Sequence, residues 1–179
     1  PLDEAVNIVF ILLLNQLKEN ENKPVLLIAM HGKNVASSLA SVVKQMSNSD
    51  SVYSYDLLLE KKMQMAYEEM KSLIEKINRG KGVLLIYDMG SVKTMGKLIS
   101  KETGIDIRFI AAPSTMIALE TVKKMSSNDD LDDIMSELEQ SYQHYFPSIV
   151  ENYHRQKKKN IIITLCMNGE GGAIQIKKY

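Results

Sequence analysis

Residues 25–30 read VLLIAM, and a polar turn follows them directly. A continuous apolar run of this length is typical of a strand that is covered on both faces of a parallel sheet. Two further runs repeat the pattern, GVLLIY over 82–87 and DIRFIA over 106–111, and each is also followed by small or polar residues. These runs decide the fold class.

Segments with the helical spacing of apolar residues separate the runs. Their stripes are Val35, Leu39, Val42, Val43 and Met46; Met63, Ala66, Met70, Leu73, Ile74 and Ile77; and Val92, Met95, Leu98 and Ile99. A short run over 52–55 adds a strand, and Gly80 is expected as a left-handed C-cap of the second helix. Alternating strands and helices predict an α/β fold: a doubly wound parallel sheet in the order 2-1-3-4, with helices on both faces.

The two ends of the chain extend beyond this pattern. Residues 5–17 read AVNIVFILLLNQL, which is shorter than the roughly 20 residues of a membrane span and predicts a buried helix. Acidic residues before it disfavour a signal peptide. A helix is expected over 129–145, and NIIITLC over 160–166 predicts an additional strand.

The expected organisation therefore has four parts. They are an N-terminal helical extension over 1–23, the main domain over 24–146, a polar linker over 147–159, and a C-terminal strand with a Gly-rich loop over 160–179.

Composition excludes several classes of protein. The 22 Lys and Arg balance 22 Asp and Glu, so no overall field attracts nucleic acid. A single Cys excludes a disulfide framework and any zinc site built from several thiolates, and no HxH or HExxH spacing supports another metal site. No cofactor is indicated. The sequence is that of a soluble cytoplasmic protein with one core.

The chemistry-bearing residues follow the expected strands. Ligands of open parallel sheets bind beyond the carboxyl ends of the strands, and the order 2-1-3-4 places His31 and Asp88 across one crevice there. A carboxylate that binds one ring nitrogen fixes the tautomer and leaves the other nitrogen as a nucleophile. Gly32 and Gly90 would let the backbone approach a phosphoryl group, and Ser91 would add a hydroxyl donor.

Each of these residues also has a simpler interpretation. His31 could be a surface residue, and Asp88, Ser91 and Ser114 could each only cap a helix. A different function would use the same crevice for binding or hydrolysing a small molecule, with His31 as general base and Ser91 or Ser114 as a polar ligand. The remaining histidines, His144 and His154, lie in polar surroundings and are expected to be exposed.

Three segments carry a resemblance to a known family. LLIAMHGKNVASSLASVV, GKGVLLIYDMGS and ETGIDIRFIAAPSTMIALETV resemble the mannose-type enzyme IIA domain of the bacterial phosphotransferase system. The closest version is the IIA-like domain within sigma-54-dependent transcriptional activators of the levan-regulator kind, whose motifs run close to HGxSTASSMA, DMGS and ETGI. The resemblance covers roughly residues 24–125 and continues more weakly towards 146.

This resemblance implies that His31 accepts phosphate from HPr or a related phosphocarrier protein and that Asp88 orients it. Gly32, Gly90, Ser91 and Ser114 become candidate phosphate-binding residues. The chain would then be a phosphoacceptor regulatory domain rather than a turnover enzyme, and a partner of other domains of a longer regulator. The alternatives in the same class are a phosphocarrier IIA subunit of a sugar transporter or of a dihydroxyacetone kinase system.

Some features depart from the family pattern. Lys33, Asn34 and Val35 replace the usual small and hydroxyl residues, and the Trp and Gly-Gly-Ser-Pro run of transporter subunits are absent, which favours the regulator branch. No GxxxxGK[ST] motif is present, so this stretch is expected neither to hydrolyse ATP nor to contact DNA.

The C-terminal segment carries a second, weaker resemblance. IIITLCMNGEGGAIQI over 161–176 resembles the first strand and thiol loop of a galactitol-type enzyme IIB module. The resemblance makes Cys166 a possible second phosphoacceptor, whereas the alternative is a small buried apolar residue at a strand end.

Self-association is expected as well. Mannose-type IIA domains are dimeric as a family, and a sheet of four parallel strands leaves two edges that can pair with another chain. The apolar helix over 5–17 adds surface of the kind that interfaces bury.

Overall fold

Four parallel strands form one sheet in the computed structural model, which describes residues 5–11, 22–111 and 113–154. The strands are β1 (Val25–His31), β2 (Val52–Leu57), β3 (Val83–Tyr87) and β4 (Ile107–Ala111). Their order is β2-β1-β3-β4, and every neighbouring pair is parallel. The predicted order of strands is confirmed.

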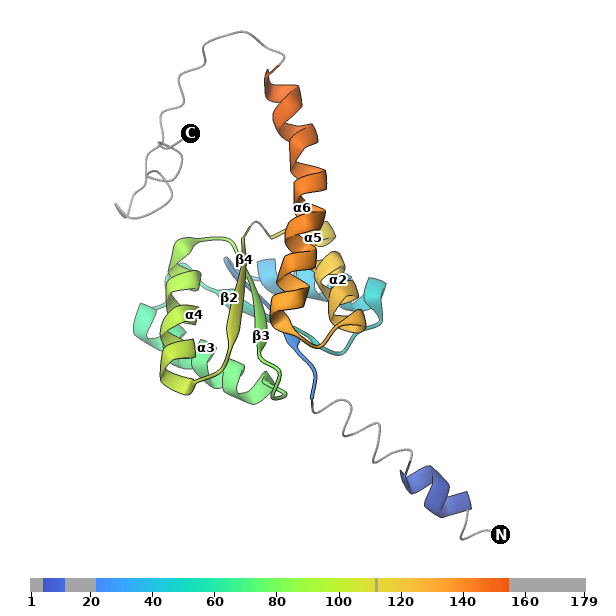
Figure 1. Cartoon of the computed structure of the whole chain (residues 1–179). Coiled ribbons are helices and arrows are strands. Elements are labelled where there is room, and N and C mark those ends of the chain that lie inside the picture. Colours follow the sequence, from blue (N-terminus) through green and yellow to red (C-terminus); the bar gives the residue numbers. More distant parts are fainter. Residues whose placement is uncertain (1–4, 12–21, 112, 155–179) are drawn as a thin grey trace. The chain divides into compact units, whose positions relative to one another are not determined.

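Helices cover both faces of the sheet (Figure 1). The helices α2 (Val35–Ser47) and α5 (Thr115–Ser127) pack side by side on one face. The helices α3 (Met63–Ile77) and α4 (Gly90–Thr103) lie on the other face. The fold is therefore the doubly wound α/β arrangement expected from the alternation of strands and helices.

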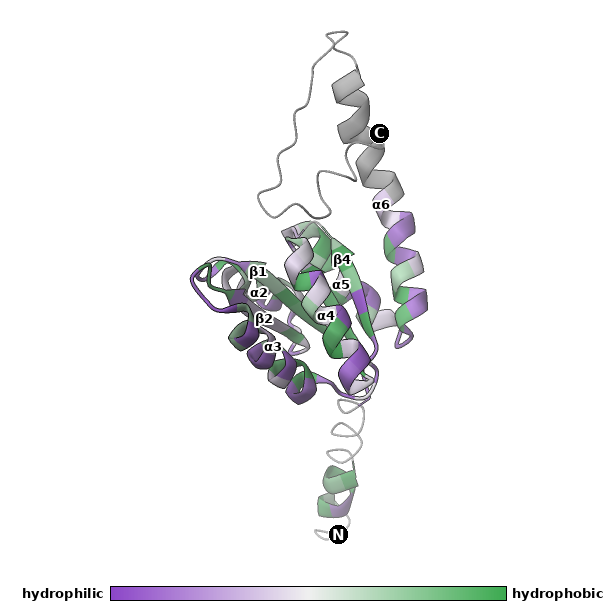
Figure 2. Cartoon of the chain, turned by 90° about the vertical axis from the view of Figure 1, so that its left-hand side faces the viewer, coloured by the Kyte–Doolittle hydropathy of each residue, from purple (hydrophilic) through white to green (hydrophobic). Residues whose placement is uncertain are grey.

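The alternation of side chains along β1 fixes which helix layer each residue meets. Val25, Leu27 and Ala29 are fully buried in the cluster that α3 and α4 complete. Because successive side chains of a strand point to opposite faces, His31 lies on the same face as these three residues. In Figure 2 the apolar strands lie between helices whose outer sides are largely hydrophilic.

The side of α2 that faces the core agrees only in part with the one its large residues predicted. Its buried residues are Ala36, Ala40 and Val43, whereas Val35, Val42 and Met46 of the expected stripe are 40%, 44% and 65% exposed. The small alanine side chains let the helix backbone lie close to the sheet, and this rotates the large apolar residues towards solvent. The predicted stripe is therefore correct at Val43 and wrong at Val35, Val42 and Met46.

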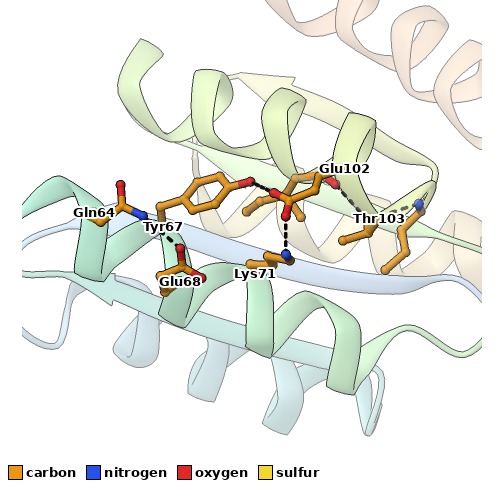
Figure 3. Close-up of polar contacts among 8 residues, drawn as sticks. Gln64, Tyr67, Glu68, Lys71, Glu102 and Thr103 are labelled. Atoms are coloured by element: carbon orange, nitrogen blue, oxygen red, sulfur yellow. Dashed lines mark hydrogen bonds and ion pairs between the residues drawn. The ribbon is translucent and has the colours of Figure 1, made fainter.

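A polar cluster joins α3 to the C-terminal turn of α4 (Figure 3). Glu102 accepts hydrogen bonds from the Lys71 ammonium group and from the Tyr67 hydroxyl group, and these two donors lower the pKa of its carboxyl group. Gln64 and Glu68 pair one turn apart on α3. The cluster connects the C-terminal end of α4 to α3. The N-terminal end of α4 lies at the carboxyl edge of the sheet.

The chain ends differ in part from the sequence-based expectations. Residues 5–11 are helical, but their large apolar side chains are 54–60% exposed, so the expected buried helix is wrong for this segment because no described element covers it. Residues 12–17 lie outside the described part. Among the described helices, none has the length and apolar character that a membrane crossing needs.

The last described helix, α6 (Leu131–His154), is longer than expected. It includes Pro147, which removes a backbone donor and bends a helix without necessarily ending it. Residues 147–154 are thus helical rather than the start of a linker, and 155–179, with the expected strand and Cys166, lie outside the described residues. The chain divides into two compact units, 1–137 and 138–179, and the site lies wholly in the first.

Gly80 has the left-handed backbone that was predicted, with φ at 91°. It does not cap α3, however, because that helix ends at Ile77 and Asn78 is its C-cap. The Asn78 side chain accepts hydrogen bonds from the backbone N–H groups of Gly80 and Gly82, which shapes the turn into β3.

Candidate functional site

His31 and Asp88 meet at the carboxyl edge of the sheet. His31 ends β1 and Asp88 follows β3, and the two strands are neighbours with Ala29 paired to Tyr87. Asp88 Oδ1 lies 3.0 Å from His31 Nδ1, and Asp88 Oδ2 accepts the backbone N–H of His31 at 2.8 Å. Because an ionised carboxylate only accepts hydrogen bonds, the proton of the neutral ring is assigned to Nδ1.

The other ring nitrogen faces the start of α4. Ser91 Oγ lies 3.1 Å from His31 Nε2, so the serine hydroxyl donates to the nitrogen that carries the lone pair. No side chain caps this helix at its Met89 N-cap position, and the N-terminus of a helix favours an anion. The side chains of His31 and Asp88 are 14% and 18% exposed, so the ring is accessible yet held on two sides.

The model of the family described as PTS system fructose IIA component (EIIA-man) matches residues 25–135. The chain belongs to the EIIA-man family. His31, Asp88 and Ser91 all lie within the matched range.

The relatives of this EIIA-man chain include a transcriptional regulator. The transcriptional regulatory protein LevR of Bacillus subtilis is 26% identical over 168 residues, which cover 92% of this chain but only 17% of LevR. A sigma-54 interaction domain protein from Enterococcus faecalis has a TM-score of 0.65 and 28% identity, covering 76% of this chain and 99% of that structure. The phosphotransferase system component EIIA from Streptococcus agalactiae, at a TM-score of 0.57 and 15% identity over 69% of this chain and 95% of that one, shares the fold.

The two glycines of the candidate site in this EIIA-man chain have different roles. Gly32 has φ at +107°, and a Cβ built on it would lie 2.8 Å from Val35 Cγ2. At Gly90, the first residue of α4, the corresponding position has no atom within 4 Å apart from its chain neighbours and the backbone of its own helix. Gly32 is thus required by the turn after β1, whereas the space beside Gly90 is open.

This difference gives a test by stability. We expect Gly32→Ala to lower the free energy of unfolding by about 1–3 kcal/mol, because alanine in the left-handed region is strained and clashes with Val35. Gly90→Ala is expected to cost nothing, because its backbone suits any residue at a helix start. Urea unfolding of both variants measures the contrast, and equal losses would contradict it.

The structure does not bring every predicted residue to His31. Ser114 Oγ accepts the backbone N–H of Ile117 at 3.2 Å and so caps α5, which is the simpler of the two interpretations of this residue. It follows β4, which β3 separates from β1. Cys166 lies outside the described residues, as do the side chains of His144 and His154 on α6.

Sequence reasoning missed Asp56, which lies near the end of β2. Its Oδ1 accepts the backbone N–H groups of Ala36 at 2.7 Å and Ser37 at 3.2 Å, so it caps α2 from a neighbouring strand. The available signal was a carboxylate at the carboxyl end of a strand beside the one that carries His31. The N-terminus of α2 is therefore already occupied by an anion, unlike that of α4.

A cavity of about 500 Å³ lies at the opposite edge of the sheet. Its lining includes Gly80, Gly82, Gly104 and Arg108, which precede or belong to β3 and β4. It is therefore remote from His31. In the described part of the chain, no group of three or more His, Cys, Asp or Glu residues is placed to hold a metal ion.

Proposed function

We propose that His31 accepts a phosphoryl group from a phosphohistidine carrier protein of the HPr kind, on its Nε2 atom. The observation that carries this proposal is the pair of contacts on one ring: Nδ1 against Asp88 at 3.0 Å and Nε2 against Ser91 at 3.1 Å. Asp88 holds the tautomer in which Nε2 has its lone pair free for attack.

The transfer is a displacement at phosphorus. The Nε2 lone pair forms a bond to phosphorus while the bond from phosphorus to the donor's ring nitrogen breaks, and that nitrogen keeps the electron pair. The His31 ring then carries positive charge, which the Asp88 carboxylate stabilises through the Nδ1 proton. The Ser91 hydroxyl turns from Nε2 to a phosphoryl oxygen, and the start of α4 favours the added negative charge.

The surface around His31 supports a protein donor. Each loop at this edge of the sheet, or the helix turn that follows it, exposes at least one large apolar side chain, among them Val35 after β1, Leu59 after β2, Met89 after β3 and Met116 after β4. Exposed apolar groups gathered around one site commonly mark a protein interface, and methionines adapt to a partner's shape. The described 500 Å³ cavity, which a small substrate would favour, lies at the other edge.

We place the domain in a regulator of a sugar operon rather than in a transporter or a dihydroxyacetone kinase system. LevR, which is named as a transcriptional regulator, aligns with 92% of this chain. The chain spans about a sixth of the length of LevR, so contacts with other domains of a longer cytoplasmic regulator belong to the proposal.

The direct test is intact mass spectrometry. The chain is incubated with phosphoenolpyruvate, enzyme I and HPr, and the expected result is a mass increase of one phosphoryl group. The label should be acid-labile and base-stable, as a phosphoramidate is, and peptide mapping should place it on His31. Omitting HPr should prevent the labelling. An unchanged mass, or a label that survives acid, would refute the proposal.

We also propose that the domain forms a homodimer. In the described sheet β2 and β4 are edge strands, and such edges readily pair with another chain. The exposed apolar residues of 5–11 add a second surface that association would bury. Light scattering over a dilution series should give about twice the 20.2 kDa mass of one chain. A single-chain mass at every concentration would contradict the dimer.

A further inference from the structure

We propose that Asp56 is a positioning residue for phosphoryl transfer: it fixes the turn that carries His31 from the opposite face of the sheet. The inference rests on the proposed role of His31. Tyr55 and Leu57, which flank Asp56 on β2, are buried in the cluster of α3 and α4. Asp56 therefore points to the other face, where its carboxylate binds the first turn of α2.

The turn between β1 and α2 needs such support. Two of its three residues have left-handed backbones, Gly32 at φ 107° and Asn34 at φ 61°. Asn34 occupies the N-cap position of α2, but its side chain makes no capping hydrogen bond. A non-glycine residue in this region costs about 1 kcal/mol or more and persists where its surroundings hold it.

The surroundings hold the turn from two neighbouring strands. On the side of β3, Asp88 binds both the backbone and the ring of His31. On the side of β2, the backbone N–H of Gly32 donates to the Leu57 carbonyl at 2.9 Å, and Asp56 binds the N–H groups of Ala36 and Ser37. Without Asp56, the start of α2 loses its cap, and the turn beside His31 loses a restraint that no residue of the turn replaces.

Asp56 also affects where an added phosphoryl group is bound. A carboxylate on the first N–H groups of α2 satisfies the donors that would otherwise attract an anion. The start of α4, beside Ser91 and the open space at Gly90, has no side-chain cap. The capped α2 and the uncapped α4 together direct the phosphoryl group to the face on which Nε2 lies.

The experiment compares Asp56→Ala, Asp56→Asn and a matched control, Asp130→Ala. Asp130 caps α6 with the same geometry, its Oδ1 accepting the N–H groups of Asp132 at 2.8 Å and Asp133 at 3.2 Å. It precedes α6, on a loop that lines the cavity at the other edge of the sheet. The two alanine variants therefore lose equivalent caps, one beside His31 and one remote from it.

Two quantities are measured at a temperature where all variants are folded. The first is the single-turnover rate of phosphorylation by phospho-HPr. We expect Asp56→Ala to lower it about 10- to 100-fold, because small misplacements of a reacting group are costly. Asp56→Asn keeps an oxygen acceptor and should stay within about threefold, and Asp130→Ala, being distant, within about twofold of the parent.

The second quantity is the ring ¹⁵N chemical shift pattern of His31, which reports the tautomer and needs no donor. Asp56→Ala should mix the two tautomers, whereas Asp130→Ala should keep Nδ1 protonated. Asp56→Ala behaving like Asp130→Ala in both measurements would overturn the inference. If Asp56→Ala does not fold, Asp56→Ser and Asp130→Ser are compared on the same readouts. A parent chain that phospho-HPr does not label refutes the proposed function, while the tautomer readout still decides the role of Asp56.

Discussion

His31→Ala is expected to abolish phosphorylation of the chain by phosphoenolpyruvate, enzyme I and HPr. The variant lacks Nε2, the atom that Ser91 contacts and that carries the lone pair needed for attack. Alanine removes the nucleophile itself, so the loss should be complete rather than partial. Intact mass after a long incubation measures it.

Controls for this variant lie in the same chain. His144→Ala and His154→Ala replace the remaining histidines and should be labelled as fast as the parent. Circular dichroism and the midpoint of thermal unfolding establish that His31→Ala is folded. A His31→Ala protein that still gains a phosphoryl group would move the acceptor to another residue and end the proposal for this site.

Asp88→Asn is expected to slow phosphorylation by about 100-fold or more while the fold persists. Asparagine can turn its NH₂ group towards Nδ1, which would leave the proton on Nε2 and block the nucleophile. It also carries no charge to stabilise the positive ring that forms during transfer. The single-turnover rate with phospho-HPr checks this prediction.

The matched comparison is Ser91→Ala. This change removes the hydrogen bond at Nε2 but leaves the tautomer set by Asp88, so its rate should lie between those of the parent and Asp88→Asn. If Asp88→Asn transfers phosphate as fast as the parent, Asp88 serves only as a structural partner of the His31 backbone.

The order of the strands and the pairing of His31 with Asp88 could be predicted from sequence for one reason. Both depend on the long buried strands, whose apolar runs are unambiguous, and on the rule that neighbouring parallel strands end at the same edge. Once β1 and β3 are neighbours, His31 at the end of β1 and Asp88 directly after β3 lie side by side.

The roles of Ser91 and Ser114 could not be separated in this way. Both are hydroxyl residues near the start of a helix that follows a strand. Only the three-dimensional structure shows that Ser91 lies against the His31 ring. Ser114 lies one strand further away, and its oxygen accepts the backbone N–H of Ile117.

Two other differences have physical causes that a linear pattern does not contain. The side of α2 that packs on the sheet includes Ala36 and Ala40, which fit there because they are small. A prediction based on the spacing of large apolar residues does not take such alanines into account. The bond partners of Asp56 lie 19 and 20 residues earlier in the chain. A strand-end carboxylate that caps a preceding helix is a tertiary contact, and no local spacing predicts it.

The open space beside Gly90 bears on how phosphorylation would be sensed. A group that enters the space beside Gly90 meets no side chain from elsewhere in the fold within 4 Å of the Cβ position, so no such side chain has to move aside. The chain itself is formally neutral. A phosphoryl group carries up to two negative charges and the positive His31 ring offsets one of them, so the chain would gain about one net negative charge. Its electric field extends about 10 Å at moderate ionic strength, so a neighbouring domain would detect the modification as a change of charge rather than as a change of shape.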